Sequence, residues 1–253
     1  MGLSDWFSGV LTRSPREVNL SLPQQEPATI EDVIVRMRLI QTQLPPSDGV
    51  AHFNKMYMAV TEDVLDRSLG QEFEDKAFVE RLDVVFANLY FKALDDYAGN
   101  PGSCARCWSP LFQARHSSRI APIQFALAGM NAHINHDLVL ALDATCREME
   151  RGVERDSAQY RDFCRINELL AEAQERIEPW VKKGVLGILD RVLGQADEAV
   201  EMWSMERARE NAWVQTEALW LLRANVELTT RFLMALDRTV GFAGRGLLFE
   251  RPI

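Results

Sequence analysis

A largely apolar stretch runs from Gln124 to Thr145, and it constrains the fold more than any other part of the chain. Read as a helix, it is hydrophobic on nearly every side, which is typical of a helix buried at the centre of a helical protein. The other elements must then surround it. Two imidazoles and a carboxylate inside it, those of His133, His136 and Asp137, need partners, because an unpaired buried polar group costs about 1–3 kcal/mol.

The remaining sequence has helical periodicity and no alternating strand pattern of useful length. Thr29 is a plausible N-cap, and Pro45-Pro46 and Gly70 are stop signals. We therefore predict an all-α, single-domain antiparallel bundle of about six to eight helices around the central buried His-containing helix. Residues 1–28 are expected to form an N-terminal arm and residues 29–253 the helical domain. The predicted helices cover residues 30–44, 50–69, 75–97, 109–116, 122–151, 157–193 and 195–240, with an irregular tail after them.

Composition limits the classes of function. The 253 residues are 47% hydrophobic and carry a net charge of −9, which argues against nucleic acid and against anionic membrane surfaces as partners. No apolar run approaches the roughly 20 residues of a membrane span, and the N-terminus lacks a signal-peptide pattern. Four cysteines are few for this length, so we expect a reducing, cytoplasmic location. A small-molecule ligand is the expected partner, and a homo-oligomer is compatible with the sequence.

The spacing His133-x-x-His136-Asp137 places three possible ligands on one side of a helix. In one interpretation they bind a divalent metal such as zinc, iron or manganese, with a further ligand from another helix. In a second they form a metal-free acid–base pair or ligand pocket, in which Asn131 and Asn135 are candidate ligand contacts. In a third they belong, with Asn131 and Asn135, to a structural hydrogen-bond network.

Asp83 is the least expected residue of its predicted helix, because it interrupts an apolar pattern that continues to Tyr90. It is either an acid–base or orienting partner of the histidines, or it pairs with an arginine such as Arg209. Tyr90, on the same side of that helix, is a candidate ligand contact. Trp213 is a second candidate, since an Arg/Glu pair precedes it, although a core tryptophan is the commoner case.

Cys104-x-x-Cys107 has the spacing of a metal-binding pair, but a zinc ribbon needs a second pair and none is present. We therefore expect two free thiols in a surface loop. No P-loop, dinucleotide fingerprint, nucleophile elbow or His-Glu-x-x-His motif occurs.

Four segments together resemble an uncharacterised bacterial family, a domain of unknown function that is expected to be all-helical. The resemblance covers about residues 45–240 and is most specific at the NAHINHDL core, residues 131–138. It implies one domain with the His/Asp helix as its signature and carries no activity to transfer. The segments are GVAHFNKMYMAVTEDV (49–64), RLDVVFANLYFKAL (81–94), PIQFALAGMNAHINHDLVLAL (122–142) and SMERARENAWVQTEAL (204–219).

Two functional hypotheses follow. The first is an enzyme that acts on a small, largely apolar molecule in an interhelical pocket, as a hydrolase, lyase or cyclase-type enzyme that can be metal-dependent. His133, His136, Asp137 and Asp83 would be its catalytic residues. The second is a non-enzymatic binding or scaffold protein in which the His/Asn/Asp cluster is structural.

Overall fold

The computed structural model describes residues 26–69, 73–167 and 205–250. Within these ranges every regular element is a helix, so the all-α prediction is confirmed. The helices, in chain order, are α1 (Ile30–Gln43), α2 (Gly49–Leu69), α3 (Lys76–Gly99), α4 (Ser109–Ala114), α5 (Pro122–Ala132), the π-helix η1 (His133–Asp137), α6 (Leu138–Glu148), α9 (Met205–Leu222) and α10 (Val226–Leu247). Residues 158–167 are also helical.

The predicted N-cap at Thr29 is confirmed. Its side chain accepts a hydrogen bond from the Asp32 backbone N–H, and the Asp32 carboxylate accepts one from the Thr29 N–H, each at 3.2 Å. This reciprocal pair satisfies two backbone donors that would otherwise lack partners in the first turn. Asp75 caps α3 in a similar way by accepting from the Phe78 N–H.

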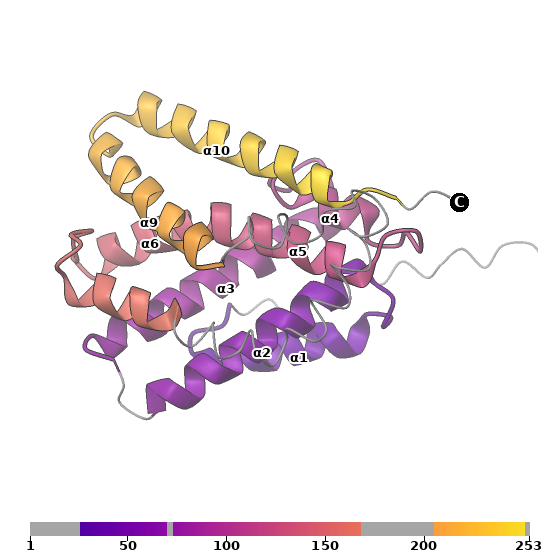
Figure 1. The fold of residues 1–253 in the computed structure, drawn as a ribbon, viewed down its shortest axis with the longest axis horizontal. Coiled ribbons are helices and arrows are strands. Elements are labelled where there is room, and N and C mark those ends of the chain that lie inside the picture. Colours follow the sequence, from indigo (N-terminus) through magenta and orange to yellow (C-terminus); the bar gives the residue numbers. More distant parts are fainter. Residues whose placement is uncertain (1–25, 70–72, 168–204, 251–253) are drawn as a thin grey trace, which may run out of the picture.

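The continuous segment α5–η1–α6 lies in the middle of the molecule, as its apolar sequence predicts (Figure 1). It contacts α2 and α10 through α5, and α3 and α9 through α6. In Figure 1, α1 and α2 lie on one side of this segment, and α9 and α10 lie on the other. The cluster of buried hydrophobic residues therefore surrounds the segment that carries both histidines.

The predicted final helix over residues 195–240 is wrong in two respects within the described residues. A turn after Leu222 divides it into α9 and α10, because Asn225 leaves helical geometry (φ −119°, ψ 99°) and caps α10 by accepting from the Leu228 N–H. The apolar pattern continues across this turn, which conceals it in the sequence. The tail that we expected to be irregular continues α10 as far as Leu247.

Several predictions lie outside the described residues. These are most of the N-terminal arm, residues 1–25, and the part of the predicted 157–193 helix beyond residue 167. Among the described helices, none is long and apolar enough to cross a membrane.

Close packing around the central segment makes a specific prediction for Gly129. A Cβ atom at this position would overlap the ring of Phe53, which itself packs edge-on against Tyr90. We expect Gly129→Ala to lower the free energy of unfolding by about 1–3 kcal/mol, as overpacked core sites do. Urea unfolding followed by circular dichroism measures this change.

Gly246→Ala is the matched control, because a Cβ there meets nothing within 4 Å. It should be neutral or mildly stabilising, since alanine is the better helix former. Equal stability of the two variants would contradict the packing described for Gly129.

Candidate functional site

The site is organised by the carboxylate of Asp137, which accepts three hydrogen bonds in the core. His133 Nδ1 lies 3.1 Å from its Oδ2 and His136 Nδ1 lies 2.8 Å from its Oδ1. Trp108 Nε1, from the start of α4, donates to Oδ2 at 2.9 Å. A buried carboxylate is expensive unless it is hydrogen-bonded or paired, and these three donors supply that stabilisation.

A π-helical turn brings the two imidazoles to one carboxylate. Over His133–Asp137 the helix widens, and the Leu138 N–H bonds to the His133 carbonyl five residues earlier. We predicted a continuous α-helix here, so the widened turn was missed. Single π-turns inside α-helices occur often at functional sites.

The hydrogen bonds determine which nitrogen of each histidine carries a proton. Burial opposes ionisation of Asp137, but its bonds with His133 and His136 hold its pKa below the ordinary value. An ionised Asp137 can only accept, so Nδ1 of each ring must be the protonated nitrogen and donate to it. In each neutral ring Nε2 is then left as an acceptor.

The two histidines are in different electrostatic environments. Burial lowers the pKa of His133 in spite of Asp137, so this imidazole is neutral at physiological pH. For His136 burial acts in the same direction, but the hydrogen bond to Asp137 and the charges of Asp137 and Asp237 outweigh it and raise the pKa. The shared carboxylate therefore lies between two rings with opposite shifts.

His133 faces an aromatic region. Its ring stacks on Phe86 with centroids 3.5 Å apart and packs edge-on against Tyr57 at 4.4 Å. Its Nε2 atom is buried and has no hydrogen-bond partner among the described residues. Asp83 Oδ2 and Tyr57 OH also lack a hydrogen bond of good geometry within the described part of the chain, although the Thr61 side chain is close enough to Tyr57 to oppose the rise of its pKa. Five further buried side-chain atoms among the described residues also lack a hydrogen-bond partner. We refer to His133 Nε2, Tyr57 OH and Asp83 Oδ2 as the three open atoms.

Asp83 lies on α3, one turn before Phe86. Burial raises the pKa of its carboxyl to about 7, although the positive charge of Arg209 acts in the opposite direction. Arg209 itself is buried, and its guanidinium donates to Asn167 Oδ1 at 2.6 Å and to the Phe163 carbonyl at 3.1 Å. Arg209 therefore acts on Asp83 through its positive charge, while its own hydrogen bonds go to Asn167 and Phe163.

His136 faces the opposite direction, toward α4 and α10. Its Nε2 lies 4.0 Å from Asp237 Oδ1, which accepts a 2.9 Å hydrogen bond from the Cys107 backbone N–H. One ligand atom each from Cys107, His136 and Asp237 lies within 4.8 Å of the others. Of the three predicted metal ligands, this group contains His136 but not His133 or Asp137. Those two residues hydrogen-bond to each other instead.

Cys104 and Cys107 are free thiols, as expected, but their predicted position in a surface loop is wrong. Both are buried, because the loop folds under α10 and packs Trp108 into the core. Burial, together with the charges of Asp137 and Asp237, raises the pKa of the Cys107 thiol well above its usual value. Burial also raises that of Cys104, to about 12.

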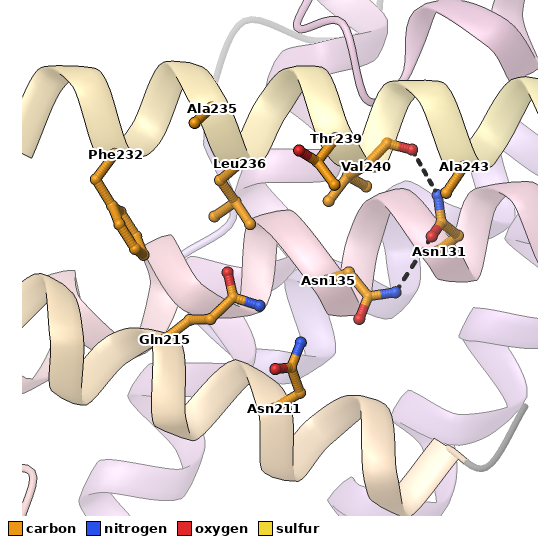
Figure 2. Close-up of a pocket in the computed structure, with 10 residues that line it drawn as sticks. All are labelled: Asn131, Asn135, Asn211, Gln215, Phe232, Ala235, Leu236, Thr239, Val240 and Ala243. Atoms are coloured by element: carbon orange, nitrogen blue, oxygen red, sulfur yellow. Dashed lines mark hydrogen bonds between the residues drawn. The ribbon is translucent and has the colours of Figure 1, made fainter.

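Asn131 and Asn135 contact a groove of about 380 Å³ between α9 and α10. Figure 2 shows both at its floor, with the Asn131 amide bonded to the Val240 carbonyl at 2.9 Å and the Asn135 amide bonded to Asn131 at 3.2 Å. None of its described lining residues is charged. These are Asn131, Asn135, Asn211, Gln215, Phe232, Ala235, Leu236, Thr239, Val240 and Ala243.

The other two predicted ligand contacts lie elsewhere. Tyr90 is fully buried, donates to Asn54 Oδ1 at 3.3 Å and packs against Trp108. Trp213 is also fully buried; its indole N–H donates to the Val153 carbonyl at 3.2 Å, and its ring packs against Phe163. Tyr90 therefore borders the His133 region, whereas Trp213 joins α9 to the helical stretch 158–167.

Comparison with known protein families identifies the family of this chain. A model described as a family of unknown function, DUF5995, matches residues 30–250. The chain belongs to this family. The match begins fifteen residues before our estimated boundary and so includes α1, and the DUF5995 assignment confirms the resemblance to an uncharacterised family. No curated protein and no solved structure gives a significant match.

Sequence reasoning treated Cys107 only as a free surface thiol and missed Tyr57, Phe86, Trp108 and Asp237. The Cys-x-x-Cys spacing followed directly by tryptophan and a proline-initiated helix was a signal for Cys107 and Trp108. Asp237 had no signal, because it lies on another helix, 101 positions after its neighbour His136, and no local spacing relates the two.

The shifted pKa of Asp83 predicts how stability depends on pH. The folded protein binds this proton more tightly than the unfolded chain, in which the ordinary pKa is 3.8. The stability that the protonated carboxyl contributes is therefore complete below about pH 4 and is lost as the pH rises through 7, by at most about 1.4 kcal/mol per pH unit. Asp83→Asn should flatten this dependence and increase stability at pH 8.

Urea unfolding at pH 5, 6, 7 and 8 measures the effect. Asp66→Asn is the control, because Asp66 is exposed on the neighbouring helix α2 and should leave the slope unchanged. If wild type and Asp83→Asn have parallel pH profiles, the raised pKa is wrong.

Proposed function

We propose that this protein is an enzyme that catalyses proton transfer on a small, largely apolar molecule held between α2, α3 and η1. His133 is its general base and Asp83 its general acid. The observation that carries the proposal is the Nε2 atom of His133. It is a buried acceptor without a partner among the described residues, on a ring whose other nitrogen is fixed by Asp137.

An acceptor of this kind is costly in a folded core. A buried polar atom left without a hydrogen bond costs about 1–3 kcal/mol, and native proteins retain few of them. A ligand hydroxyl or an acidic C–H group placed at Nε2 would supply the missing donor. The imidazole is neutral because burial lowers its pKa, so it is ready to accept that proton.

Asp137 completes the base. Its carboxylate accepts from His133 Nδ1 at 3.1 Å, which selects the tautomer and stabilises the imidazolium that forms on proton transfer. The Trp108 indole donates to the same oxygen and keeps the carboxylate in place. Asp137 is therefore a positioning residue in this proposal.

Asp83 and Tyr57 supply the complementary groups. Burial raises the pKa of Asp83 to about 7, so a large fraction of this carboxyl is protonated near neutral pH and can give up a proton. The Tyr57 hydroxyl is a second donor, with a pKa that burial and the charge of Asp83 raise far above neutrality. In the proposed reaction His133 takes one proton and Asp83 returns one, as in an elimination, isomerisation or ring closure.

The walls of the region favour an apolar substrate. The rings of Phe53, Tyr57 and Phe86 surround His133. Phe86 is half-buried and lies 3.5 Å from the imidazole, so it is the side chain that would move to admit a ligand. A reducing, cytoplasmic location accompanies this proposal, since all four cysteines are free thiols.

The alternative is a scaffold or binding protein in which the cluster is structural. The three hydrogen bonds to Asp137 favour this alternative, because they would hold α4 against the central segment whether or not the protein is an enzyme. The three open atoms favour the enzyme, because a purely structural network gains nothing from groups without partners in the described chain.

His133→Asn tests the proposal. The asparagine amide can still donate to Asp137 in place of Nδ1, but it removes the basic nitrogen. We expect the purified wild type to convert at least one component of a small-molecule extract, detected by untargeted mass spectrometry. His133→Asn and Asp83→Asn should slow that conversion by at least about 100-fold, the usual contribution of acid–base groups.

Gln215→Leu is the control, because Gln215 lines the groove between α9 and α10 and is not among the aromatic contacts of His133. It should retain the conversion. Undiminished turnover by His133→Asn, or no conversion of any component by the wild type, would contradict the proposal.

A further inference from the structure

We propose that Cys107, His136 and Asp237 form a binding site for one divalent transition-metal ion, with zinc the best match. The site uses the face of the cluster that the proposed proton transfer does not use, and it does not depend on that function. One donor atom from each of the three residues lies within 4.8 Å of the others. A shared ion would need only small side-chain shifts to bring them to ligand distances of about 2.0–2.3 Å.

The donor set is characteristic of zinc. Sulfur from cysteine, nitrogen from histidine and oxygen from a carboxylate are its three common protein ligands. A soft thiolate argues against magnesium and calcium, which take oxygen ligands. Three protein ligands leave a fourth tetrahedral position for water or another molecule, as catalytic zinc sites do.

His136 is prepared for this role by its outer neighbour. Its Nδ1 bonds to Asp137 Oδ1 at 2.8 Å, so Nε2 carries the lone pair and is directed toward Cys107 and Asp237. A carboxylate behind a metal-binding histidine is the usual arrangement in zinc proteins, where it orients the ring and raises its basicity. Asp137 thus supplies the outer contact, and this explains why it need not be a ligand.

Backbone geometry holds the other two ligands together. The Cys107 N–H donates to Asp237 Oδ1 at 2.9 Å and joins the loop before α4 to α10. Gly241, one turn after Asp237, permits this approach, since a Cβ there would lie 2.5 Å from the Arg106 carbonyl oxygen. Three distant parts of the chain therefore converge on one point.

Cobalt substitution of the purified full-length protein tests the site. We expect Co²⁺ to bind with one ion per chain and to produce a near-ultraviolet thiolate-to-cobalt charge-transfer band with intense visible bands of tetrahedral cobalt. Added Zn²⁺ should displace it and abolish the bands. Cys107→Ser should lose the charge-transfer band, and Asp237→Asn should weaken binding by at least 10-fold.

Cys104→Ser is the matched control, because Cys104 is another buried cysteine three positions away, outside the ligand group. It should retain the band and the stoichiometry. Loss of the band in Cys104→Ser but not in Cys107→Ser, or failure of the wild type to bind Co²⁺ and Zn²⁺ at micromolar concentrations, would overturn the proposal.

A measurement on the wild type covers the case in which Cys107→Ser does not fold. The zinc-edge X-ray absorption spectrum of the zinc-loaded protein should fit one sulfur ligand together with nitrogen and oxygen ligands. A shell with no sulfur, or with two sulfurs, would contradict the assignment. None of these results depends on His133, so the metal site and the proposed proton transfer can fail separately.

Discussion

The Asp137 carboxylate is a full negative charge held in the core by hydrogen bonds from His133, His136 and Trp108. Each donor comes at a structural cost. The two imidazoles reach the same carboxylate through a π-helical turn in the central helix, and the indole requires the loop before α4 to fold inward. Removing any donor would leave a buried charge less well compensated, so these elements depend on one another.

The same carboxylate gives two histidines on one turn different chemistry. His133 is neutral and faces aromatic rings, with an Nε2 acceptor that lacks a partner among the described residues. His136 is turned toward a thiol and a second carboxylate, Asp237. We infer a proton-transfer site on the first side and a metal site on the second. Asp137 orients both rings, but in this account it neither exchanges a proton with the substrate nor binds the metal.

The sequence alone predicted the parts of this arrangement that depend on local patterns. The apolar stretch around His133 identified the central helix, and Thr29 identified a helix start. The parts that failed depend on tertiary contacts. The turn at Asn225 interrupts an unbroken apolar pattern. The pairing of Cys107 with Asp237 joins residues 130 positions apart, and no local spacing indicates it. The sequence thus located the site but could not name all of its members.

The protonation of the two imidazoles tests the central claim most directly. Nitrogen-15 chemical shifts and two-bond couplings of the metal-free protein at pH 7 distinguish the two neutral tautomers and the imidazolium. We predict that His133 is neutral with its proton on Nδ1, and that any neutral fraction of His136 carries its proton there too. An Nε2–H tautomer at His133, or a charged His133, would mean that Asp137 does not organise the site as described.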